Sequence, residues 1–317
     1  MVRGRVIAAV RRLGVLLAGL SVVAALAACT TGGTTATPGP GGSGATCPSP
    51  VDPPRQYRID ERVLRVRVGT NGWGGGSWGN LTVFGDGRVI TEGWIFHQGP
   101  VASIGAARSL AEADDQHPGP ALMPIKVQRI SPTSMSRLVD LALAAGVGRD
   151  VDLGGYEELP TDQAEVQFWI RVDGEARQTS AYALGDGFDD QSGLSQDQRA
   201  ARRTMETFVV TLTDLDGACG VEVLDEQQEF VPAAVVAMAQ PWPPDWAAPD
   251  AEVAWPGPDL PGERLPSGID CVVVTGAELT ALLDAVDDAT QQSAWLHAEQ
   301  RWKVALRTLL PDESACP

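Results

Sequence analysis

The sequence predicts an α+β fold in which antiparallel sheets carry about three packed helices. The steps Asp86-Gly87 and Asp173-Gly174 each separate two β-prone runs, and Asp-Gly in that position is typical of a tight β-hairpin. Three other segments repeat apolar residues at intervals of three and four after a capping residue, which indicates amphipathic helices. The 317 residues are enough for one large domain or two small ones.

The first strands are expected soon after residue 60. Val63–Val68 alternates apolar and basic positions, as a strand with one buried face does. Leu81–Phe84 and Arg88–Ile90 then flank the first Asp-Gly turn, and Glu165–Ala183 holds the second hairpin. Further strands are expected at residues 125–130, 271–274 and 302–310.

Each predicted helix starts at a residue type that caps helix N-termini. Ser131 precedes Pro132, and proline is favoured at the first helical position. Ser195 and Thr275 are each followed three residues later by Gln or Glu, the spacing of a capping box. The apolar positions expected to be buried are Met135, Leu138, Val139 and Ala142 in the first helix, Ala201, Met205, Phe208, Val209 and Leu212 in the second, and Leu279, Leu282, Leu283 and Val286 in the third.

The first and third helices share a pattern that suggests an internal repeat. Ser131 aligns with Thr275 and Met135 with Leu279, and each helix follows an apolar strand. One interpretation is a duplicated strand-helix-strand unit whose copies share one core; the other is the generic spacing of amphipathic helices. We expect two α+β modules, at residues 56–218 and 219–317.

The N-terminal 28 residues have the order of a bacterial secretory signal. Arginines are followed by an apolar run from Val15 to Ala28, which is shorter than a comfortable membrane span. Leu26-Ala27-Ala28-Cys29 resembles the lipobox of bacterial lipoproteins, which implies that Cys29 carries palmitate-type acyl chains and becomes the mature N-terminus. An ordinary cleaved signal is the alternative. Residues 29–55 are expected to be a flexible tether, rich in Thr, Gly, Ser and Pro.

The chain is strongly acidic, with a formal net charge of −17. Removal of residues 1–28, which hold four arginines and no acid, would take this charge to −21. Such a surface repels phosphate backbones and anionic headgroups, so we expect no nucleic-acid partner. Attachment to the lipid bilayer is therefore expected through acylated Cys29 alone, at the outer face of the cytoplasmic membrane.

Export places the remaining cysteines in an oxidising compartment, where disulfides are the default. Cys47, Cys219, Cys271 and Cys316 allow three pairings, and sequence alone leaves all three open. We expect Cys271 to pair with Cys316 and Cys47 with Cys219. A zinc site is not favoured because these cysteines form no C-x-x-C pair.

The motifs that suggest chemistry are weak. Residues 75–79 match G-x-S-x-G, but a strand follows where a nucleophile elbow needs a helix. The three histidines, His97, His117 and His297, have no metal-ligand spacing, and the carboxylates of residues 186–190 lack the EF-hand pattern. We therefore predict no catalytic, cofactor-binding or metal-binding residue.

Tryptophans mark the candidate recognition surface. Trp242, Trp246 and Trp255 lie in the proline-rich segment 240–262, and Trp73 and Trp78 lie in a glycine-rich loop. Exposed tryptophans on a stiff loop can stack on sugar rings or bind a partner protein, whereas buried ones would belong to the core. The expected partner is an unidentified envelope protein or glycan.

The whole pattern resembles a group of uncharacterised lipoproteins of high-GC Gram-positive bacteria. The resemblance depends on five short stretches: Leu64-Arg65-Val66, Phe84–Ile90, Ser180–Gly185, Leu194–Arg199 and Leu309–Glu313. It implies an envelope lipoprotein and no particular activity. We therefore expect a non-enzymatic binding or interaction protein, with an envelope-acting hydrolase and a transporter's solute-binding protein as alternatives.

Overall fold

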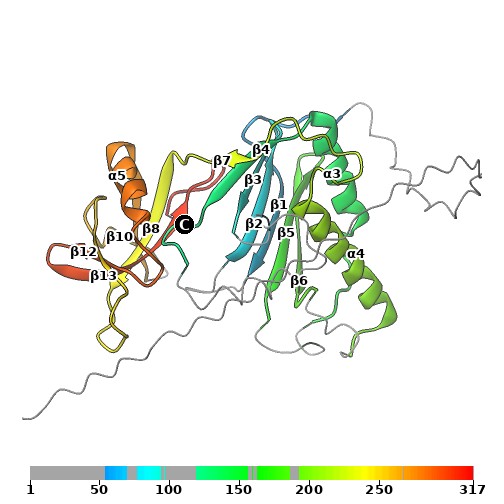
Figure 1. Cartoon of the computed structure of the whole chain (residues 1–317). Coiled ribbons are helices and arrows are strands. Elements are labelled where there is room, and N and C mark those ends of the chain that lie inside the picture. Colours follow the sequence, from blue (N-terminus) through cyan, green and yellow to red (C-terminus); the bar gives the residue numbers. More distant parts are fainter. Residues whose placement is uncertain are drawn as a thin grey trace, which may run out of the picture. The chain divides into compact units, whose positions relative to one another are not determined.

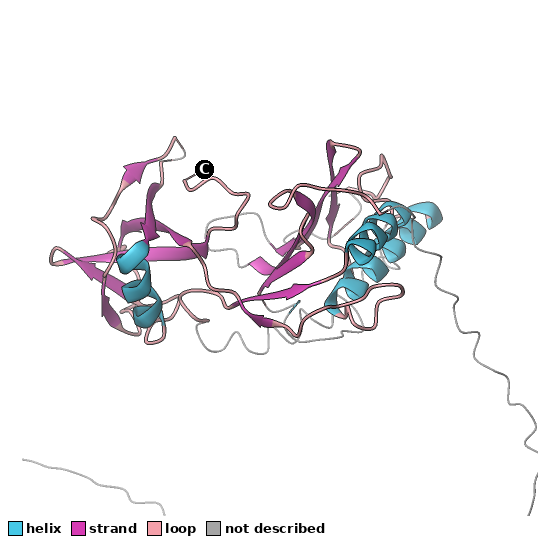
Figure 2. Cartoon of the chain, turned by 90° about the horizontal axis from the view of Figure 1, so that it is seen from above, coloured by secondary structure: helices cyan, strands magenta, loops and turns pink. Residues whose placement is uncertain are grey.

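The computed structural model describes residues 54–69, 77–93, 96, 119–155, 159, 163–185, 193–266 and 268–316, with the side chains of residues 77 and 78 excepted. Within these ranges the chain forms two β-sheets and three helices (Figures 1 and 2), which confirms the predicted α+β class. Residues 1–53, which include the predicted leader and most of the predicted tether, lie outside this description.

The first sheet has seven antiparallel strands in the order β6-β5-β1-β2-β3-β4-β7. Strands β1 to β4 follow one another as a meander, and β5 then returns to the free side of β1. The bounds are β1 Arg62–Gly69, β2 Ser77–Phe84, β3 Arg88–Glu92, β4 Ile125–Arg129, β5 Glu165–Val172, β6 Glu175–Tyr182 and β7 Gln228–Glu229.

Both predicted hairpins are confirmed, and their turn residues explain why. Gly87, between β2 and β3, has a φ of +84°, and a Cβ there would come within 2.3 Å of the Ile130 carbonyl oxygen. Asp173 and Gly174, between β5 and β6, both have positive φ, at 52° and 81°. The first turn thus has three residues (85–87) and the second has two, and each needs a residue that tolerates the left-handed region.

Helices α3 (Pro132–Ala144) and α4 (Gln196–Thr213) lie side by side against one face of this sheet (Figures 1 and 2). The Ser131 hydroxyl accepts the Ser134 amide, and Ser195 forms the predicted reciprocal capping box with Gln198. The predicted apolar positions of both helices are buried apart from Ala201, which is half-buried. The buried side chains of both helices pack on inward-facing residues of β1 and β5. The apolar residues spaced by 3.6 in the helices and by 2 in the strands therefore form one core.

The second sheet has six strands in the order β10-β11-β8-β13-β12-β9, antiparallel except where β9 joins β12. Helix α5 (Gly276–Val286) packs on it, with Leu279 and Leu282 buried. The bounds are β8 Ala234–Pro241, β9 Glu252–Ala254, β10 Glu263–Arg264, β11 Asp270–Thr275, β12 Ala294–His297 and β13 Gln300–Thr308.

The third helix differs from prediction at its start. Thr275 occupies the N-cap position, but its side chain makes no capping hydrogen bond. Gly276, the first helical residue, has a φ of +59°, so the first peptide leaves the helical path that a capping box requires. The predicted box at this helix is therefore wrong.

The two sheets have separate apolar clusters, so the shared core implied by the repeat hypothesis is absent from the described residues. The boundary between the sheets also differs from the predicted residue 219. After α4 the chain runs along the edge of β4, where Leu224 donates to the Arg129 carbonyl and β7 adds a short strand. The second sheet begins at Ala234.

A C-terminal strap, residues 309–316, contacts both sheets. Leu310 packs in a cluster with Phe84, Ile90 and Ile125 on the first sheet. Asp312 forms ion pairs with Arg62 (3.0 Å) and Arg65 (3.5 Å), also on the first sheet. Cys316 is disulfide-bonded to Cys271 of β11, in the second sheet. The strap thus joins two layers that have separate cores.

Candidate functional site

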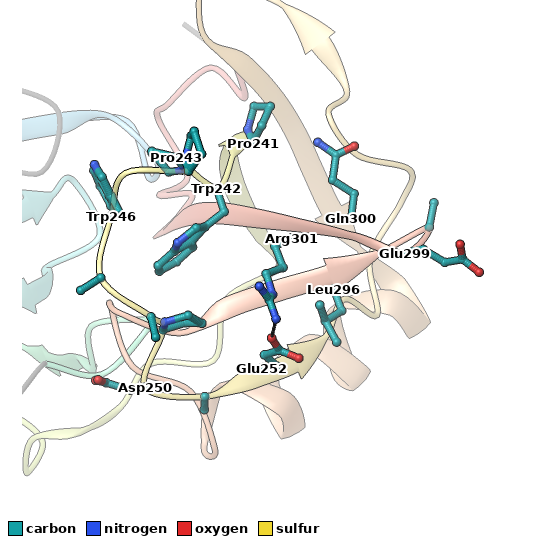
Figure 3. A pocket seen from close by; sticks show the side chains of 16 residues that line it. Pro241, Trp242, Pro243, Trp246, Asp250, Glu252, Leu296, Glu299, Gln300 and Arg301 are labelled. Atoms are coloured by element: carbon teal, nitrogen blue, oxygen red, sulfur yellow. Dashed lines mark ion pairs between the residues drawn. The ribbon is translucent and has the colours of Figure 1, made fainter.

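An open groove lies beside the β12–β13 hairpin (Figure 3). The segment from Pro241 at the end of β8 to Glu252 at the start of β9 curves away from the sheet and encloses a cavity of about 1120 Å³. We call this cavity the tryptophan groove. One wall is the proline- and tryptophan-rich segment 241–251, and the other is the hairpin, residues 296–301.

The curved segment is held by its own chemistry. Pro241, Pro243, Pro244 and Pro249 restrict φ and so reduce the entropy lost on ordering. The Trp242 amide donates to the Arg301 carbonyl at 3.0 Å, and the Asp250 amide donates to the Gln292 carbonyl at 3.2 Å. One end of the segment is therefore fixed to β13 and the other to the turn before β12, and the groove is formed before any ligand arrives.

Two tryptophans form the aromatic part of the groove. Trp242 is half-buried and Trp246 is 45% exposed; their ring centroids are 5.8 Å apart with the planes at 81°. The Lys303 ammonium lies 4.1 Å from the centroid of the Trp246 ring, and burial lowers the pKa of this lysine. A cation beneath one face of Trp246 fixes that ring and leaves the rest of it accessible.

The polar part of the groove comes from the strands and faces Trp242. In Figure 3 the side chains of Trp242, Arg301 and Glu252 point into the space that the segment encloses, and Arg301 pairs with Glu252. Both members of this pair are about half exposed, at 56% and 40% of their side-chain surface. The pair therefore remains accessible to a ligand in the groove.

The hairpin tip that ends the groove has unusual backbone geometry. Ala298 and Glu299 have φ values of +48° and +63°, in a region that costs a non-glycine residue about 1–3 kcal/mol. The two-residue turn closes between His297 and Gln300. Glycine at positions 298 and 299 would relieve this strain. The chain has Ala298 and Glu299 there instead, so both side chains lie at the groove rim.

The structure divides the five predicted tryptophans. Trp242 and Trp246 line the groove. Trp255 is only 7% exposed, packs edge to face on Trp295 at 5.5 Å and donates its indole N–H to the Pro258 carbonyl. Trp255 is therefore a core residue and not part of a recognition surface, because its ring is buried and its indole N–H is already hydrogen-bonded. Trp73 and the side chain of Trp78 lie outside the described residues.

The cysteines agree with the predicted pairing as far as the structure describes them. Cys271 is bonded to Cys316, as expected. Cys219 also belongs to a disulfide. Cys29 and Cys47 lie outside the described residues, so the lipidation of Cys29 and the bond between Cys47 and Cys219 remain predictions.

A second cavity of about 510 Å³ borders the first sheet near the end of α4. Asp214, Asp216, Asp225 and Glu226 line it, together with Thr91, to which the Gln227 amide donates. Nothing in it matches the combination of aromatic and polar surface in the tryptophan groove. Over the described ranges, no group of three or more His, Cys, Asp or Glu could hold a metal ion.

The polar half of the groove was missed by sequence reasoning. Arg301, Glu252 and Glu299 come from three short elements, and the Ala298-Glu299 turn carries none of the residues that mark a hairpin. Only the pairing of β9 with β12 brings Glu252 beside the hairpin.

Comparison with known proteins adds no assignment. No known protein family matches this chain, and no curated protein sequence matches it either. None of the described helices is long and apolar enough to cross a membrane.

Proposed function

We propose that this protein is a lipid-anchored, non-enzymatic binding protein of the bacterial cell envelope, and that the tryptophan groove is its recognition surface. The observation that carries the proposal is the groove itself, where Trp242 and Trp246 line a cavity of about 1120 Å³ together with an accessible ion pair. Aromatic surface with a few polar groups is the usual composition of a binding site.

The leader supports the location. The lipobox-like Leu26–Cys29 implies an acylated Cys29 at the outer face of the cytoplasmic membrane, and the 24 residues from Thr30 to Pro53 would form a tether. The predicted tether is thus shortened at its end, because Arg55 is bound to Ser136 and Asp140 of α3. As a coil, such a tether would hold the folded part about 25–30 Å from the lipid. A groove at that distance would meet envelope material rather than headgroups.

The experiment is retention of the purified full chain, kept in detergent, on membrane-free envelope material. We expect the wild type to be retained and the double variant Trp242→Ala/Trp246→Ala to bind about tenfold more weakly, because aromatic residues carry most of the energy at such surfaces. Leu224→Ala is the matched control, an exposed apolar side chain beyond the groove. Equal retention of the double variant and the wild type would contradict the proposal.

A further inference from the structure

We infer that the ligand of the tryptophan groove is an uncharged glycan, bound as a short stretch of a longer chain. This inference rests on the proposed function and adds the chemical class of the ligand. It follows from the aromatic wall, from the ion pair opposite, from the sign of the rim charges and from the size of the groove.

The aromatic wall suits the C–H face of a sugar ring. Indole is a large flat apolar surface with an N–H at its edge, so it binds ligands that have both an apolar face and polar substituents. Trp246 is 45% exposed although it is fixed by Lys303, and Trp242 stands beside it at nearly a right angle. The exposed part of Trp246 is therefore the aromatic surface most accessible to a ligand, with the half-buried Trp242 ring beside it.

The ion pair suits hydroxyl groups. A guanidinium has five N–H donors and a carboxylate about four acceptor positions, so Arg301 and Glu252 keep bonding capacity after pairing with each other. A hydroxyl can accept from one and donate to the other at the same time. A ligand with several hydroxyls on each ring satisfies both members without breaking the pair.

The rim charge excludes two other ligand classes. Asp250, Glu252 and Glu299 line the groove against Arg301, and Lys303 lies beneath Trp246, so acidic groups are in excess by one and an anionic polymer is repelled. A proline-rich peptide offers carbonyl acceptors and few N–H donors, so it would make few hydrogen bonds to these carboxylates. An uncharged polyhydroxylated chain meets neither difficulty.

The size indicates more than one sugar ring. Sites for small molecules are about 300–1000 Å³ and enclose most of their ligand. The tryptophan groove, at about 1120 Å³, exceeds that range and is open to solvent. A polymer segment can therefore lie in it with both ends in solvent.

The test is native affinity electrophoresis of the full chain in gels that contain one polysaccharide each. Dextran, mannan, galactan and glycol chitin are the uncharged or nearly uncharged probes, and polygalacturonate is the anionic one. We expect at least one uncharged probe to retard the wild type, and Trp246→Ala to bind that probe about tenfold more weakly. Polygalacturonate should retard neither protein. Trp246→Phe should keep most of the retardation, and Leu224→Ala all of it.

The outcomes separate this inference from the proposed function. Retardation by polygalacturonate alone, or by any probe without dependence on Trp246, overturns the glycan assignment. The glycan assignment is also overturned if envelope material retains the protein in a tryptophan-dependent way while no uncharged probe retards it. In that case the proposed function still stands. Absence of envelope retention overturns both. Trp246 lies on an exposed segment, so its replacement should not disturb the fold. The control is thermal melting of Trp246→Ala, which should be the same as that of the wild type.

Discussion

One buried arginine connects helix α4 to the strands and loops of the first sheet. Arg202 of α4 is fully buried and donates to the carbonyls of Leu153, Tyr182 and Ala183 at 2.7–3.2 Å. The end of β6 and the loop before β5 are thereby joined to the helix through one guanidinium. Its planar fork can reach three acceptors at once, which an ammonium cannot do in the same way.

Glu92 on β3 gives a residue-scale prediction about pH. Burial raises the pKa of its carboxyl, although Asn80 and the more distant Arg307 act in the opposite direction. A raised pKa means that the folded state holds the proton more tightly, so stability is lost as pH rises through that pKa. We expect Glu92→Gln to raise Tm by about 2–4 °C at pH 7.

The control for Glu92→Gln is Glu229→Gln, at an exposed position on β7. It should leave Tm unchanged at every pH, because a surface substitution of this kind has little effect. In acid, where the carboxyl of the wild type is protonated, Glu92→Gln and the wild type should melt alike. A lower Tm for Glu92→Gln at pH 7 would contradict the account, since the carboxylate would then be stabilising.

The positions of hairpins and helices that have characteristic turn or cap residues could be predicted from the sequence, because those residues act locally. The hairpins at Asp86-Gly87 and Asp173-Gly174 depend on residues that tolerate positive φ, so composition determines them locally. Strand β8, by contrast, went unrecognised although residues 232–239 form an apolar run. It is the centre of the second sheet, buried on both faces, and such strands lack the alternation that marks a half-buried one.

The tryptophan groove was predictable only in part, for a related reason. Trp242 and Trp255 have the same proline-rich context, yet one lines the groove and the other packs on Trp295. Long-range pairing decides this, because β9 joins β12 across about 40 residues and draws Trp255 into the core behind it. No local pattern contains that information.

The C-terminal strap is the element that depends most on a covalent bond. Cys271 and Cys316 are separated by 45 residues, and closing such a loop is worth about 4 kcal/mol in the chain-entropy model. We therefore expect Cys271→Ala/Cys316→Ala to lose about 2–4 kcal/mol of unfolding free energy, measured by urea denaturation. A loss below about 1 kcal/mol would show that the strap is held by its other contacts.

The strap's ion pairs add a dependence on acid. Burial alone would raise the pKa of the Glu313 carboxyl, but the charges of Arg307 and Arg65 and the Leu310 amide outweigh it, so the pKa is lowered. A lowered carboxyl pKa stabilises the fold above the ordinary value of this group, and the contribution is lost as pH falls through the folded-state pKa. In acid the strap should therefore be held more weakly to both sheets, because Arg65 lies in β1 and Arg307 in β13.

At the scale of the whole molecule, location depends on one residue. We expect the mature wild type to begin at Cys29 and to carry acyl chains, seen as labelled palmitate and as a mass above that of the polypeptide. Cys29→Ser should incorporate no palmitate and should not be processed at that position. A Cys29→Ser protein that is processed normally and stays membrane-bound would show that the lipid assignment is wrong.

The central claim is that an envelope component occupies the tryptophan groove in the living cell. The most direct measurement is photo-crosslinking in intact cells, with a photoreactive amino acid at Ala248 inside the groove or at Val231, which is 80% exposed and lies outside it. The account predicts a discrete adduct from position 248 that disappears with Trp242→Ala, and none from position 231. Equal adducts from both positions, or none from position 248, would contradict it.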